Sequence, residues 1–309
     1  IPSRRVSSEP LQITDNLLEE FSEETKRELS TTMVFVRILT KLLRDKNIGE
    51  RVVPIVPDEA RTFGMDSLFR QFGIYSSVGQ KYEPEDADKV MFYRESKNGM
   101  MLEEGINEAG AFSAWLALAT SYSNHQLPMI PFYIYYSMFG FQRIHDLAWA
   151  AGDSRAKGFL LGATSGRTTL NGEGLQHQDG HSHIMAGTIP NCRSYDPCFS
   201  YELETIVSEG IEDMYVKNND RYYYITLMNE NYIHPKRPKN ATPENIMKGA
   251  YCYFKAKKPD FRVLASGLTL NFALDAKNKL EAFGIELEIW SVTSFNELYK
   301  DGIECERNE

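Results

Sequence analysis

The chain has few cysteines, and their spacing matches no common metal site. Its four cysteines, Cys192, Cys198, Cys252 and Cys305, form no CxxC pair. The spacing therefore argues against both a cysteine-rich zinc site and a disulfide framework. Reduced thiols are usual in the cytoplasm, and we expect a cytoplasmic protein.

An excess of positive charge is also absent. The chain has 34 Lys and Arg against 43 Asp and Glu, which gives a net charge of −9 and a pI near 5.3. Nucleic-acid binding needs a concentrated basic surface, so this balance argues against a nucleic-acid partner. A small molecule or another protein is the more reasonable partner.

No apolar run is long enough to cross a membrane. Residues 109–142 contain no Asp, Glu, Lys or Arg, but the apolar part "AGAFSAWLALAT" is about half of the ~20 residues that a span requires. The polar stretch "SYSNHQLPMIP" with two prolines then interrupts it. We expect a buried helix followed by a buried strand, and no membrane partner.

The chain begins without an initiator methionine and without the apolar core of a signal peptide. It ends with "DGIECERNE", directly after a segment with the pattern of a strand. We therefore expect both ends to be cuts through a longer polypeptide.

Helical and strand patterns alternate along most of the sequence. Apolar residues with helical spacing predict helices at 31–45, 107–123, 141–152 and 200–216. Short apolar or β-branched runs between them predict strands at 51–56, 128–136, 158–164 and 221–228. This alternation predicts an α/β domain with a mostly parallel sheet flanked by helices.

The chain divides into four parts by composition. Residues 1–28 look like a surface connector, residues 29–232 like the α/β domain, and residues 233–245, with three prolines, like a linker. A second unit, 246–309, has a strand at 261–267, a helix at 271–284 ending on Gly284, and a strand at 285–294. One βαβ unit is too small to fold alone, so we expect the start of a truncated α/β domain.

The stretch "NGEGLQHQDGHSH", residues 171–183, concentrates three of the six histidines. His177, His181 and His183 with Asp179 could be metal ligands, structurally satisfied loop residues, or a set for proton transfer. The glycines of this stretch do not match a phosphate-binding loop, because the GxxxxGK[ST] lysine is missing. The residues alone leave these three alternatives open.

Glu108 lies at the start of the uncharged helix, with Ala, Gly and Phe after it. It could be an ordinary acid of a first helical turn, which the helix dipole favours. Alternatively, its apolar surroundings could raise its pKa and let it share a proton with a ligand nitrogen. Tyr136 and Phe139, at the end of the strand "PMIPFYIYY" and just beyond it, could face a planar ligand ring.

In this order, five segments carry a resemblance to a known family: "VPDEARTFGM", "GINEAGAFSAW", "PMIPFYIYYSMFGFQRIHDLAWAAGD", "TSGRTTLNGEGLQHQDGHSH" and "YYYITLMNENY". The chain closely resembles the thiamine diphosphate-dependent decarboxylase component of bacterial pyruvate dehydrogenase complexes, in its single-chain homodimeric form. The resemblance runs from Arg4 to Arg307. It implies a pyrimidine-binding domain followed by the start of a transketolase-like carboxyl-terminal domain.

The resemblance also implies roles for individual residues. Glu108 is similar to the glutamate that hydrogen-bonds N1′ of the cofactor's aminopyrimidine, Phe139 to the ring stacked on that heterocycle, and Ile106 to the apolar residue that holds the cofactor bent. The residues that the resemblance places around substrate and intermediates are His177, Glu173, Tyr136, Asp58 and Glu59.

The implied activity is oxidative decarboxylation of pyruvate, with transfer of the acetyl group to a lipoyl carrier. The implied partners are a second copy of the chain, and the lipoyl acetyltransferase and dihydrolipoyl dehydrogenase components of the multienzyme complex in a bacterial cytoplasm.

One family feature is missing. The family binds the diphosphate and Mg²⁺ through GDG followed about thirty residues later by NN, and this pair is absent from the chain. We therefore expect a fragment that holds only the pyrimidine end of the cofactor and is inactive alone. The alternatives are a non-catalytic dimerisation module and a metal-dependent hydrolase built on residues 171–183.

Overall fold

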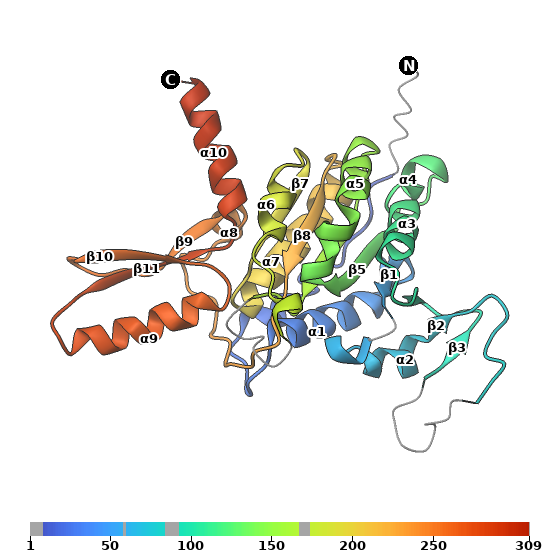
Figure 1. The fold of residues 1–309 in the computed structure, drawn as a ribbon, viewed down its shortest axis with the longest axis horizontal. Coiled ribbons are helices and arrows are strands. Elements are labelled where there is room, and N and C mark those ends of the chain that lie inside the picture. Colours follow the sequence, from blue (N-terminus) through green and yellow to red (C-terminus); the bar gives the residue numbers. More distant parts are fainter. Residues whose placement is uncertain (1–8, 58–59, 84–92, 167–173, 309) are drawn as a thin grey trace.

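The computed structural model describes residues 9–57, 60–83, 93–166 and 174–308. The largest element is a six-stranded sheet in which every pairing is parallel, with the order β4-β1-β5-β6-β8-β7. Figure 1 labels four of its strands, β1, β5, β8 and β7, in the centre of the molecule. Its strands are β1 (Val52–Val56), β4 (Leu102–Glu103), β5 (Ile130–Tyr136), β6 (Phe159–Ala163), β7 (Cys192–Tyr195) and β8 (Tyr222–Thr226). The predicted α/β fold with a mostly parallel sheet is confirmed.

Helices cover both faces of this sheet, as a parallel sheet requires. One face packs against α3 (Glu108–Ala119), α5 (Gly140–Asp153) and α6 (Ser182–Gly187), and the other against α1 (Thr31–Leu43) and α7 (Ser200–Ile211). Side chains alternate along each strand, so in β5 Tyr133 and Tyr135 join the first core, while Phe132 and Ile134 join the second.

Several elements differ from the sequence prediction. The helix predicted to run to residue 123 ends at Ala119, and a short helix α4 (Ser121–Asn124) follows. The helix predicted over 200–216 is an α-helix only as far as Ile211, and Glu212–Val216 continue it as a π-helical turn. Elements not predicted are α2 (Asp66–Phe72), α6, α8 (Pro243–Lys248), β4, β7, β9 (Ala250–Phe254) and the small pair β2 (Ile74–Tyr75) and β3 (Glu95–Ser96).

The charge-free run 109–142 forms α3, α4 and β5 inside this domain. Trp115 of α3 is fully buried and donates its indole N–H to the backbone oxygen of Phe159 at 3.1 Å. In the part of the chain that the structure describes, no helix is long and apolar enough to cross a bilayer.

The carboxyl-terminal unit has a three-stranded sheet in the order β10-β11-β9. The strands β10 (Phe261–Ala265) and β11 (Leu287–Val292) are parallel and joined by α9 (Thr269–Glu281), so the predicted βαβ unit is confirmed. Gly284 donates its N–H to the oxygen of Glu281, just beyond the helix. The sequence indicated that the chain ends after the last strand, but residues Phe295–Asn308 form the helix α10, which projects from the body (Figure 1).

The segment expected to be a surface connector and the one expected to be a linker both pack against the main domain. Leu18 and Phe21 belong to the core, and Leu29 forms an antiparallel bridge with Tyr232. His234 is fully buried. The polar composition of these segments did not reveal this packing, because their few apolar residues are spaced irregularly.

Glu202 of α7 links the two units. Its carboxylate accepts hydrogen bonds from the backbone N–H groups of Cys198 and Phe199, at 2.6 and 3.0 Å. It also accepts hydrogen bonds from Tyr251 of β9 and Ser291 of β11, both at 2.6 Å. Burial raises the pKa of Glu202, and these four bonds oppose that effect. The carboxyl-terminal sheet is therefore attached to α7 through a buried carboxylate whose hydrogen-bonding capacity is filled by four donors.

Candidate active site

A cavity of about 530 Å³ lies at the carboxyl ends of β4, β1 and β5, the edge of a parallel sheet where ligands usually bind. The segments that leave these three strands form most of its wall. Its lining residues are Pro57, Thr62, Gly105, Ile106, Asn107, Glu108, Tyr133, Tyr135, Tyr136, Phe139, Arg143 and His177.

Glu108 is the first residue of α3. Gly105, with a φ of +70°, turns the chain between β4 and this helix, a conformation that favours glycine. The Asn107 side chain then caps the helix by accepting the Gly110 N–H at 3.0 Å. This arrangement places the Glu108 side chain at the cavity with 17% of its surface exposed.

Arg143 of α5 contacts Glu108 directly. Its Nη1 lies 2.6 Å from Oε1 of Glu108, and its guanidinium lies 4.6 Å from the centre of the Phe139 ring. The hydrogen bond uses Oε1, while Oε2 accepts none from the described residues. The sequence prediction missed Arg143, although it is the first charged residue after the charge-free run and could have been recognised on that basis.

Three aromatic rings form one wall of the cavity. The His177 ring lies 5.2 Å from that of Tyr136 and 5.3 Å from that of Phe139, with edge-to-face geometry in both pairs. Phe63 packs against Tyr136 from behind at 5.1 Å. This packing holds Phe139 and His177 in place beside Glu108.

Tyr133 and Tyr135 of β5 also line the cavity. Burial, together with the carboxylates of Glu108 and Glu104, raises the pKa of Tyr133, so its phenol stays protonated at neutral pH. Tyr135 is also buried, and its hydroxyl has no hydrogen-bond partner among the described residues. Neither residue could be recognised as a site residue from the sequence, because tyrosines in a buried strand usually belong to the core.

The structure brings together five of the residues that the resemblance pointed to: Glu108, Ile106, Tyr136, Phe139 and His177. Ile106 is 71% exposed although it is apolar, so it can contact a ligand. The other three predicted residues, Asp58, Glu59 and Glu173, lie outside the described residues.

The two later histidines lie elsewhere. Nε2 of His183 is 3.0 Å from Oγ1 of Thr226, and burial lowers the pKa of His183. His181 is exposed, and Asp179 accepts the backbone N–H groups of His181 and Ser182 at the start of α6. Within the described ranges, no three His, Cys, Asp or Glu side chains gather as metal ligands would. Residues 174–183 therefore offer no ligand set for the metal-site alternative.

Two family models match the sequence. The pyruvate dehydrogenase E1 component middle domain matches residues 14–235, and the transketolase-like carboxyl-terminal domain matches residues 249–308. Curated proteins named pyruvate dehydrogenase E1 component are 59% identical over 309 residues in Pseudomonas aeruginosa and 54% identical over 315 residues in Escherichia coli K12. Each alignment covers 99% of this chain and 35% of the relative, so the chain spans about a third of their length.

Solved structures share the fold at low identity. A transketolase from Campylobacter jejuni superposes with a TM-score of 0.68 at 19% identity, covering 93% of this chain and 40% of that one. A chain described as a split-gene transketolase, an inactive β4 tetramer, superposes with a TM-score of 0.58 at 15% identity, covering 86% of this chain and 72% of that one.

Proposed function

The chain belongs to the pyruvate dehydrogenase E1 component family, and we propose that it forms the pyrimidine-side half of a thiamine diphosphate site that decarboxylates pyruvate. The observation that carries this proposal is the position of the Glu108 carboxylate. It lies on the cavity that Phe139 and Ile106 also line.

The lining residues fit an aminopyrimidine. A planar heterocycle needs an aromatic or apolar contact on its faces and a hydrogen-bonding group at its ring nitrogen. Phe139 and Ile106 offer the first, and Oε2 of Glu108 offers the second. Arg143 orients the carboxylate through its contact with Oε1.

When bound, the cofactor supplies an electron sink for loss of carbon dioxide from a 2-oxo acid. Glu108 would hold a proton at ring nitrogen N1′ by accepting a hydrogen bond there. His177, fixed by Tyr136 and Phe139, would meet the substrate side of the cavity. Tyr133, protonated at neutral pH, could donate a hydrogen bond but would not act as a base.

The same cavity is poorly suited to a diphosphate. Arg143 is the one Lys or Arg side chain among the described lining residues, and it is paired with Glu108. Binding of the diphosphate and Mg²⁺ therefore belongs, in this proposal, to a domain outside this chain. The proposal also includes a homodimer, transfer of the acetyl group to a lipoyl carrier, assembly with the acetyltransferase and dihydrolipoyl dehydrogenase components, and a location in the bacterial cytoplasm.

A chimaera tests the proposal. This chain would replace the corresponding third of the Escherichia coli relative, to which it is 54% identical. We expect pyruvate-dependent release of carbon dioxide. Glu108→Gln in the chimaera should lower kcat by about 10²–10⁴-fold without changing the circular dichroism spectrum, because an amide cannot share the proton as a carboxylate does.

Glu244→Gln is the matched control, since Glu244 is an exposed acid of α8 that pairs only with Lys248 among the described residues. It should retain the activity of the unmodified chimaera. A folded but inactive chimaera, or near-normal turnover after Glu108→Gln, would contradict the proposal.

The chain by itself should bind thiamine diphosphate and Mg²⁺ weakly and show no decarboxylase activity. Calorimetric titration of the 309-residue chain measures this affinity. Micromolar binding would show that the diphosphate site is present after all.

The second candidate function is a non-catalytic association module. It is supported by exposed apolar side chains on the carboxyl-terminal unit, namely Phe261, Leu264, Phe283 and Tyr299. Light scattering over a range of concentrations would detect self-association. Activity of the chimaera would show that association is not the only function.

A further inference from the structure

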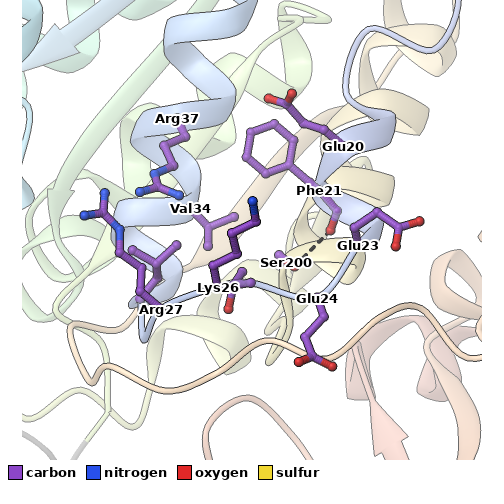
Figure 2. A pocket seen from close by; sticks show the side chains of 11 residues that line it. Glu20, Phe21, Glu23, Glu24, Lys26, Arg27, Val34, Arg37 and Ser200 are labelled. Atoms are coloured by element: carbon purple, nitrogen blue, oxygen red, sulfur yellow. Dashed lines mark hydrogen bonds between the residues drawn. The ribbon is translucent and has the colours of Figure 1, made fainter.

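A second cavity, of about 580 Å³, lies between α1 and the segment that precedes it. Figure 2 shows its lining side chains. It shares no lining residue with the cavity around Glu108. Part of its wall is apolar and consists of Phe21, Leu29 and Val34, all of which are buried in the core. The floor of the cavity is therefore apolar, whereas its rim carries exposed charged side chains.

Three cationic side chains share this cavity. Arg37 comes from α1, and Lys26 and Arg27 come from the preceding segment. In Figure 2 the guanidinium groups of Arg27 and Arg37 lie on the same side of the pocket, and the Lys26 side chain extends into the space beside them. None of the three forms an ion pair with a carboxylate of the described residues.

The two arginines are close enough to repel each other. Burial and the charge of Arg27 lower the pKa of Arg37, and Glu20 opposes this effect to a smaller extent. Like charges held together without a paired acid cost free energy, which binding of an anion would recover.

Two of the three glutamates that line the cavity are paired with other cations. Glu20 pairs with Lys41 at 2.8 Å, and Glu23 pairs with Lys236 at 2.9 Å. Figure 2 shows the carboxylates of Glu23 and Glu24 directed away from the two arginines. These acids therefore leave the positive groups available to a ligand.

We propose that this cavity binds a phosphate monoester, with Arg27 and Arg37 contacting the phosphate and Phe21, Leu29 and Val34 contacting the organic part. A guanidinium presents a planar fork of donors that matches phosphate oxygens, and two forks can neutralise a dianion. Lys26 adds a third positive charge. The apolar wall favours an ester over free phosphate.

Calorimetric titration of the 309-residue chain with phenyl phosphate tests the proposal, with inorganic phosphate and benzyl alcohol as comparison probes. We expect saturable binding with one site per chain, weaker binding of phosphate, and no binding of the alcohol. Arg27→Gln and Arg37→Gln should each weaken binding about tenfold or more. Arg37→Lys should cause a smaller loss, because the charge remains but the fork is gone.

Lys279→Gln is the control for loss of one positive charge, since Lys279 is exposed on α9 and far from this cavity in the sequence. The affinity of this variant for phenyl phosphate should equal that of the unmodified chain. Thermal unfolding of each variant verifies the fold, and if Arg37→Gln does not fold, the exposed Arg27 carries the test.

Three results would overturn the proposal. The first is no saturable binding of phenyl phosphate up to about 10 mM, which corresponds to less than about 3 kcal/mol of binding free energy. The second is equal affinity for phenyl phosphate in the arginine variants and in Lys279→Gln. The third is binding of benzyl alcohol as tight as that of phenyl phosphate. Tighter binding of a glutamate-rich peptide would instead assign the surface to an acidic protein partner. The thiamine proposal is unaffected by any of these results, because the two cavities share no residue.

Discussion

Protonation of His234 should control the acid stability of this domain. The His234 side chain is 0% exposed, its Nδ1 accepts the backbone N–H of Ser200 at 3.0 Å, and its Nε2 donates to the backbone oxygen of Leu29 at 2.9 Å. These two bonds require a neutral ring with its proton on Nε2. Burial lowers the pKa of His234 from 6.5 to about 4.

The sign of the effect follows from the two pKa values. Between pH 6.5 and about pH 4 the unfolded chain binds a proton at His234 that the folded chain does not bind. The free energy of unfolding therefore decreases as the pH falls through this window. At ~1.4 kcal/mol per pKa unit the full loss is about 3 kcal/mol, and about 2 kcal/mol of it occurs by about pH 5.

Urea denaturation followed by circular dichroism, at several pH values between about 7 and 5, measures this loss. His234→Gln should be less stable than the unmodified chain at neutral pH. Its stability should also fall less with pH, by about 2 kcal/mol, because the titrating group is gone. His125→Gln, at an exposed position, controls for the loss of a histidine. An equal decrease with pH in the unmodified chain and in His234→Gln would refute the reasoning.

Two further changes test the packing. Tyr251→Phe removes one of the four donors to the buried Glu202 carboxylate. It should lower the free energy of unfolding, measured by urea denaturation, by about 1–3 kcal/mol. The control Tyr299→Phe, at a 70% exposed position, should have little effect. Gly140→Ala would place a methyl group against the ring of Tyr135 and should cost about 1–3 kcal/mol; an unchanged melting temperature would show that β5 and α5 can separate without penalty.

Much of the fold could be predicted from the sequence. The strong periodicity of 31–45 and the apolar runs at 128–136 and 158–164 identified α1, β5 and β6, because regular elements buried on known faces leave a regular pattern. Short elements such as β7 and α6 left no such pattern. They are held by neighbours distant in the sequence, since β7 pairs with β8 along its whole length.

The candidate site, too, could be predicted only in part from the sequence. Ile106, Glu108 and Phe139 were identified through the resemblance, and they do line one cavity. Arg143 was not, because its contact with Glu108 joins residues 35 positions apart. Sequence patterns report local structure well, but they do not show which side chains meet across a sheet edge.

The sequence by itself determined the alternation of helices and strands, the negative net charge and the family, because these depend on residue types and on spacing along the chain. Only the tertiary structure decided the ion pair of Arg143 with Glu108, the separation of His183 from His177, and the burial of His234 in a segment that looks like a linker. The physical reason is that each depends on distances between segments far apart in sequence, which packing of the two cores sets.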